Sequence, residues 1–159
     1  MRRFTFITTA LDPPNVDIAS ALWGVGSSQL SVGNNRFGPC IGGHLTASGG
    51  GVFITVNGPL TILAGSHFGN MRADAGGIIA LNPVNHPVLT LIGTPNWTNC
   101  FAVAGDLSVI RGVYQSITGG ATGTRYNCYS NSIINTNGAG VNYYPGNVAG
   151  QAVQGGQYI

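Results

Sequence analysis

The sequence predicts an all-β protein, a right-handed parallel β-helix of about five short coils with an irregular N-terminal segment and a C-terminal cap or oligomerisation tail. Three observations lead to this fold. A pattern that contains glycine in four of its five copies recurs at spacings of 22 to 29 residues, a period typical of solenoids and other repeat folds. Apolar residues make up 43% of the chain and charged residues only 6%, so the chain is too hydrophobic for disorder. Lys and Glu do not occur, which removes the usual solvent face of a helix.

The first 20 residues lie outside the repeat. They contain the stretch LDPPN, in which Pro13 and Pro14 make a stiff, extended connection. We expect residues 1–20 to cap or dock the first coil and to attach the chain to a partner, residues 21–135 to form the β-helix, and residues 136–159 to form the tail. A secretory signal is not predicted, because threonines interrupt the first apolar run and no convincing small-residue cleavage site follows it.

Each repeat is predicted to hold two strands joined by a tight corner. Side chains of a strand point to opposite faces in turn, and the apolar parity of the repeat switches after its fourth column. The fourth column favours residues that tolerate a left-handed backbone, and it contains Ser28, Gly50, Gly76, Gly105 and Asn131. The glycines therefore predict corners of a coil rather than a ligand-binding loop.

The predicted core consists of rows of inward side chains. The row before the corner contains Trp23, Leu45, Met71, Cys100 and Tyr126, and the row after it contains Leu30, Val52, Ile78, Leu107 and Ile133. A third apolar run follows in most repeats, at 59–63, 87–92 and 112–117, and completes a three-stranded coil. The repeats are too short for propeller blades and lack the signature of leucine-rich repeats. A jelly roll would show no register between repeats.

The composition argues against several classes of function. The net charge of +2 comes from six scattered Arg and four Asp, with no basic stripe that would predict nucleic-acid binding. No apolar run is long enough to insert across a membrane. Cys40, Cys100 and Cys128 show no metal-binding spacing and are predicted to be small buried residues. The histidines lack short metal-ligand spacing as well, so neither a metal nor a cofactor is predicted.

A strip of polar and aromatic side chains is predicted on the outside of the coils, by the same alternation. Amides and aromatic faces are groups that sugar rings hydrogen-bond to and pack against. The candidate glycan- or host-binding residues on this strip are His44, Asn70, Arg72, Asn99, Arg125 and Tyr129. The alternative interpretation is a ladder of stacked, solvated polar side chains without a ligand.

Five residues are predicted to make contacts between chains. Phe101 and Val103 are predicted to face outward on neighbouring rows, and exposed apolar groups of this kind indicate a covered face. The tail carries Tyr143, Tyr144 and Tyr158 with little charge, so association with other copies is its expected use.

Catalysis is not predicted. Polysaccharide-cleaving β-helix enzymes need a pair of carboxylates or acidic calcium ligands. The chain offers only Asp12 and Asp17 in the irregular front segment, and Asp74 and Asp106, which flank a corner rather than stack. Two chains of an assembly could still combine their carboxylates.

Residues 118–159 resemble the C-terminal end of phage and prophage tail-fibre or tailspike-like β-helix proteins, through ATGTRYN, IINTNGAG, YYPGN and the terminal GGQY. Residues 44–117 resemble that family more loosely, through the glycine corners and LTLIGTPNW. The resemblance implies a structural virion protein, located in the tail and made in the bacterial cytoplasm. It also implies a homotrimer, attached to other tail proteins and contacting bacterial surface glycans. A β-helix polysaccharide depolymerase and a bacterial surface adhesin are the alternatives.

Overall fold

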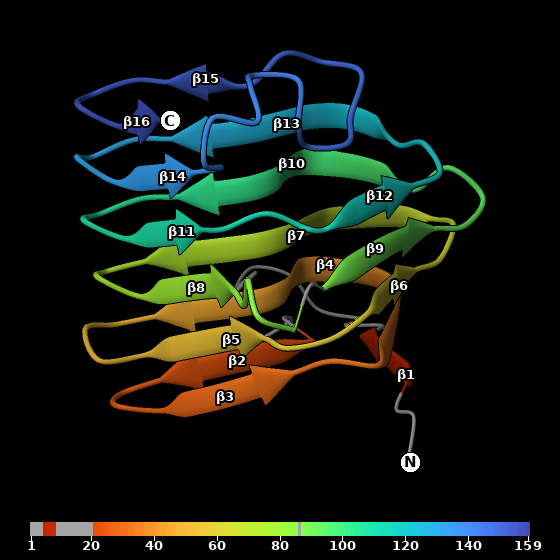
Figure 1. Ribbon diagram of the computed structural model, residues 1–159, viewed down its shortest axis with the longest axis horizontal. Coiled ribbons are helices and arrows are strands. Elements are labelled where there is room, and N and C mark those ends of the chain that lie inside the picture. The colour runs from red at the N-terminus through yellow and green to blue at the C-terminus, as the bar shows by residue number, and fades with distance from the viewer. Residues whose placement is uncertain (1–4, 9–20, 86) are drawn as a thin grey trace.

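The computed structural model describes residues 5–8, 21–85 and 87–159. These residues form sixteen strands and no helix, arranged as a parallel β-solenoid of about five turns (Figure 1). The predicted all-β fold and the parallel stacking of coils are therefore confirmed. Every strand pairs in parallel with the equivalent strand of the next turn, and the pairs form three ladders that run along the solenoid.

The first ladder contains β2 (Leu22–Val25), the C-terminal half of β4 (Asn35–Ser48), β7 (Ser66–Asp74), β10 (Asn96–Ala104), β13 (Thr122–Cys128) and β15 (Gln151–Ala152). The second ladder contains β3 (Gln29–Val32), β5 (Phe53–Val56), β8 (Ile78–Leu81), β11 (Val109–Arg111), β14 (Ile133–Asn135) and β16 (Gln157–Tyr158). The third ladder contains β1 (Thr5–Thr8), the N-terminal half of β4, β6 (Leu60–Ile62), β9 (Val88–Leu91) and β12 (Ser116–Thr118).

The glycine-rich stretches lie at the corners between the first and second ladders, as predicted. Positive φ angles occur in these corners, at Gly76 (φ 83°) but also at Asp106 (φ 54°) and Leu107 (φ 64°). Gly105 serves another purpose, because a Cβ there would lie 2.5 Å from the Tyr129 ring. Glycine thus supplies both the turn and the room for an aromatic side chain in the next coil.

The corners differ in length, and this corrects the predicted core rows. Three residues separate the strands at 26–28 and 75–77, whereas four separate them at 49–52, 105–108 and 129–132. One extra residue reverses the face on which every following side chain lies. Leu107 lies within the four-residue corner itself and is 71% exposed rather than inward, and Leu22, not Trp23, pairs with Leu45. The inward row of the second ladder is Leu30, Ile54, Ile79, Ile110 and Ile134.

The C-terminal segment 136–159 continues the solenoid rather than leaving it. β15 pairs with β13 and β16 pairs with β14, so both main ladders gain one more strand. Residues 136–150, which connect β14 to β15, take the place of a third-ladder strand and bring Tyr144 into the core. The last coil is therefore closed by this segment (Figure 1).

Candidate functional site

The predicted outward strip is divided by the structure into a buried and a surface part. His44 and Asn70 are fully buried, so the prediction that they face outward is wrong. Arg72, Asn99, Arg125 and Tyr129 are partly exposed.

The reason is a bend inside the long strands of the first ladder. The pairing register shifts between Cys40 and Gly43 in β4 and between Trp97 and Cys100 in β10. At such irregularities two consecutive side chains can lie on the same face. His44 and Leu45 are both fully buried, and so are Phe101 and Ala102. Strict alternation could not predict this.

The buried polar residues form one hydrogen-bonded chain across the core. His67 Nε2 donates to the Leu63 carbonyl at 2.9 Å, so the other ring nitrogen of a neutral His67 must accept. It accepts from His44 Nε2, also at 2.9 Å. His44 Nδ1 lies 3.3 Å from Asn70 Oδ1, and Asn70 Nδ2 lies 3.2 Å from the Tyr114 hydroxyl.

Two proton arrangements satisfy the hydrogen bonds that run from Leu63 to Tyr114. If both imidazoles are neutral, His44 Nδ1 is an acceptor, and the Asn70 amide must turn so that its Nδ2 donates to His44 and its Oδ1 accepts from Tyr114. If the amide keeps Oδ1 toward His44, His44 must carry an added proton. Burial, and then the neighbouring His67, lower the pKa of His44 to about 3, and burial also lowers the pKa of His67. The neutral arrangement therefore holds at neutral pH, and the chain is a structural element of the core.

The surface part of the strip is organised around an ion pair. Arg72 Nη2 lies 3.0 Å from Asp74 Oδ2 on β7. Burial, and then the negative charge of Asp106, raise the pKa of Tyr129, whose hydroxyl also lies in the field of Arg72 and Asp74. The predicted residues Arg72 and Tyr129 are thus brought together with both described carboxylates.

Three of the predicted inter-chain residues are buried within the single chain. Phe101 is fully buried, Tyr144 is 1% exposed and Val103 is 5% exposed, so the prediction that they contact another chain is wrong for these three. The Phe101 and Tyr144 rings lie 5.0 Å apart, and the Tyr144 and Tyr158 rings 6.2 Å apart. The Tyr143 hydroxyl donates to the Tyr114 carbonyl at 3.2 Å. These tyrosines fill the end of the solenoid interior instead of projecting from it.

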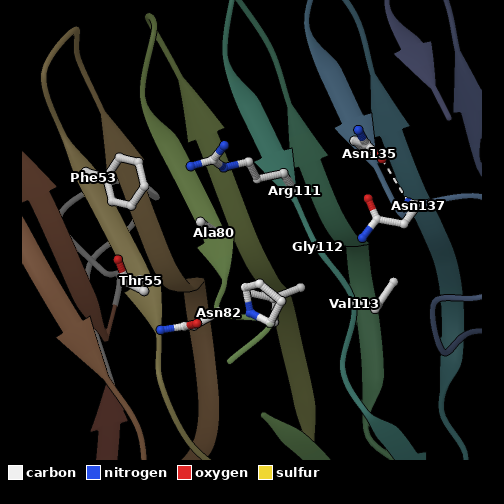
Figure 2. A pocket seen from close by; sticks show the side chains of 11 residues that line it. Phe53, Thr55, Ala80, Asn82, Arg111, Gly112, Val113, Asn135 and Asn137 are labelled. Carbon is white, nitrogen blue, oxygen red and sulfur yellow. Dashed lines mark hydrogen bonds between the residues drawn. The ribbon is translucent and has the colours of Figure 1, made fainter. Parts of the chain in front are cut away.

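A groove of about 460 Å³ lies on the outer face of the second ladder (Figure 2). This size is typical of small-molecule sites. Thr55, Ala80, Arg111 and Asn135 form one outward row on four adjacent strands, in register with one another. The small Ala80 leaves the hollow between larger neighbours.

The groove is aromatic, cationic and amide-rich. The Arg111 guanidinium carbon lies 5.7 Å from the centre of the Phe53 ring. Asn82 is held in place because its Nδ2 donates to Asn57 Oδ1 at 2.6 Å while its Oδ1 accepts from the Val84 amide at 2.9 Å. At the far end Asn135 Oδ1 accepts from the Asn137 amide at 2.8 Å. We call this surface the second-ladder groove.

Sequence reasoning missed the second-ladder groove because the predicted rows were out of register at the corners. With corners of three or four residues, Phe53 and Arg111 fall on the same outer face two strands apart. One feature of the sequence does indicate the groove: Arg111 is the only charged residue in any described strand of the second ladder.

The described residues give no sign of a metal site or of a membrane span. They contain no cluster of three or more His, Cys, Asp or Glu side chains, and within them no helix could cross a bilayer. The three cysteines are free and buried, as predicted. Asp12 and Asp17 lie outside the described residues.

Comparison with known proteins finds no family, no curated protein and no solved structure that matches this chain.

Proposed function

We propose that this protein is a structural component of a phage tail, a tail-fibre or tailspike-like solenoid that contacts glycans on the bacterial surface. The observation that carries the proposal is the second-ladder groove, in which an aromatic ring, a guanidinium and several amides line an open surface across four coils. The sequence resemblance of residues 118–159 to the ends of tail-fibre proteins supports the same function.

The chemistry of the groove suits a sugar chain. The apolar faces of sugar rings pack on aromatic side chains, and their hydroxyls pair with amides and guanidinium groups. The row from Thr55 to Asn135 covers three strand spacings, about 14 Å at roughly 4.8 Å each. An elongated site of this kind suits a segment of polysaccharide better than a compact metabolite.

The solenoid gives such a site rigidity, because the row Thr55, Ala80, Arg111 and Asn135 lies on hydrogen-bonded strands of a continuous ladder. In the proposed assembly the protein is a homotrimer in the virion tail, and residues 1–20 attach it to other tail proteins. Three copies of the groove would raise the avidity of individually weak contacts. Most of residues 1–20 lie outside the described part of the chain.

The test is binding of the purified chain to a panel of immobilised bacterial lipopolysaccharides and capsular polysaccharides, measured by biolayer interferometry. We expect saturable binding to members of the panel and a loss of about tenfold or more in Phe53→Ala, because the variant removes the apolar face on which a sugar ring packs. Trp23→Ala is the matched control, since Trp23 is an exposed aromatic residue on the first ladder.

Two results would contradict the proposal. One is a folded wild-type protein that binds no polysaccharide of the panel. The other is binding that Trp23→Ala weakens as much as Phe53→Ala does, because the second-ladder groove would then not be the site.

A further inference from the structure

Arg111 carries a positive charge that no acidic group of the groove balances. The residues lining the second-ladder groove include neither Asp nor Glu. Within the described part of the chain the only ion pair found joins Arg72 to Asp74, on a different ladder. Arg111 is exposed, and its one specific contact found there is with the Phe53 ring.

The Arg111 side chain lies over the groove, so its hydrogen-bond donors are available to a ligand there. The side chain extends from β11 across the small Ala80 toward Phe53 (Figure 2). A guanidinium presents five donors in a planar fork, which matches the two oxygens of a carboxylate. Stacking on an aromatic face uses the flat side of the guanidinium and leaves the donors at its edge available.

We infer that the second-ladder groove takes an acidic polysaccharide, with the carboxylate of a uronic acid unit bound by Arg111 and an adjoining sugar ring packed against Phe53. This inference rests on the proposed function and names the class of glycan that the site selects. One guanidinium among neutral amides matches one negative charge in a repeating unit. The amides of Asn135 and Asn137 lie at the far end of the groove, where the neutral hydroxyls of a neighbouring unit would follow.

The experiment uses the full chain and three soluble probes. The acidic probe is an oligosaccharide that alternates glucuronic acid with a neutral N-acetylhexosamine. The reduced probe is the same oligosaccharide with its carboxyl groups reduced to alcohols. The phosphate probe is an oligosaccharide of uncharged sugars whose only charges are phosphate groups. Binding is measured by titration calorimetry at low and high NaCl. We expect the acidic probe to bind at least tenfold more tightly than the reduced probe, and its affinity to fall with salt.

Variants of Arg111 separate charge from geometry. Arg111→Gln should weaken binding of the acidic probe about 10- to 100-fold and leave the reduced probe nearly unchanged. Arg111→Lys keeps the charge but loses the fork, so we expect an intermediate loss. Arg36→Gln is the matched control, because Arg36 is an exposed arginine on the third ladder and its loss changes the net charge equally. Ala80→Leu should block both probes by filling the hollow.

The outcomes distinguish this inference from the proposed function. Equal binding of the acidic and reduced probes, unaffected by Arg111→Gln, would overturn the inference while leaving a glycan-binding groove. Tighter binding of the phosphate probe would overturn the choice of a carboxylate. If Arg36→Gln weakens binding of the acidic probe as much as Arg111→Gln does, the effect is one of net charge. That result would overturn the assignment of the binding site to Arg111. Failure to bind any probe, together with failure on the polysaccharide panel, would overturn both proposals.

Discussion

At His44 the chain carries a titratable group in a place where a charge is costly. The ring stacks on Phe37 at 4.8 Å and meets the edge of His67 at 4.9 Å, and its nitrogens face His67, Asn70 and the backbone of Gly38. Asn70 in turn hydrogen-bonds to the Tyr114 hydroxyl, and His67 hydrogen-bonds to the Leu63 carbonyl. No carboxylate contributes to the lowered pKa of either imidazole. Protonation would therefore leave an uncompensated buried charge.

The folded chain should lose stability as the pH falls below about 6.5. His44 is neutral in the folded protein down to a pKa of about 3, whereas in the unfolded chain it takes up a proton near its ordinary value of 6.5. The unfolded state thus binds more protons between these two values, and acid favours it. Between pH 7.5 and pH 5 we expect His44 alone to lower the free energy of unfolding by about 2 kcal/mol.

Urea denaturation at the two pH values measures this effect. His44→Gln should show a smaller pH dependence, because one of the two buried imidazoles is gone. A wild-type stability that is the same at pH 7.5 and pH 5 would contradict a neutral, buried His44.

At the scale of the element, the C-terminal segment closes the solenoid with tyrosines in unlike environments. The Tyr143 hydroxyl accepts from the Tyr114 amide and donates to the Tyr114 carbonyl. It therefore satisfies both backbone polar groups of Tyr114 in the fourth coil. Tyr144 is 1% exposed, and its hydroxyl is buried without a hydrogen-bond partner among the described residues. Its ring contributes packing, whereas its hydroxyl contributes a desolvation penalty.

Two conservative substitutions should therefore act in opposite directions. Tyr143→Phe should destabilise the chain by about 1–2 kcal/mol, because it leaves the Tyr114 amide without its partner. Tyr144→Phe should be neutral or stabilising by up to about 1 kcal/mol, because it removes an unpaired buried hydroxyl. Chemical denaturation at pH 7.5 compares them, and a Tyr144→Phe variant that is destabilised as much as Tyr143→Phe would contradict this account.

Corners and bends also explain which elements the sequence could predict. Periodicity located the coils and the glycine corners, because small residues must recur wherever the chain turns. It could not show that corners contain either three or four residues, so Leu107 was placed inside although it is 71% exposed. Nor could it show the bends within β4, β7 and β10, where His44, Asn70 and Phe101 turn inward. The second-ladder groove depends on the corner register, and so it emerged only from the fold.

At the scale of the whole molecule, the structure changes which residues are available for assembly. The tyrosines of the C-terminal segment face the interior, while its valines do not. Val148 and Val153 are 51% and 42% exposed, and both lie along β13, bonded to its backbone through their own amides. In the proposed homotrimer, such apolar side chains on the last turn would contact the second and third copies.

We therefore expect the double substitution Val148→Asp, Val153→Asp to convert a trimer into a folded monomer, because it places charges on a surface that would be buried between chains. Light scattering measures the mass, with three times the 16.3 kDa of the chain expected for the wild type, and circular dichroism confirms the retained fold. Val84→Asp is the control, since Val84 is 79% exposed in the segment between β8 and β9 and should leave the trimer intact. A double variant that remains trimeric would place the contact elsewhere. A wild type that is monomeric at every concentration would contradict the trimer itself, and the second-ladder groove would then have to bind its glycan without avidity.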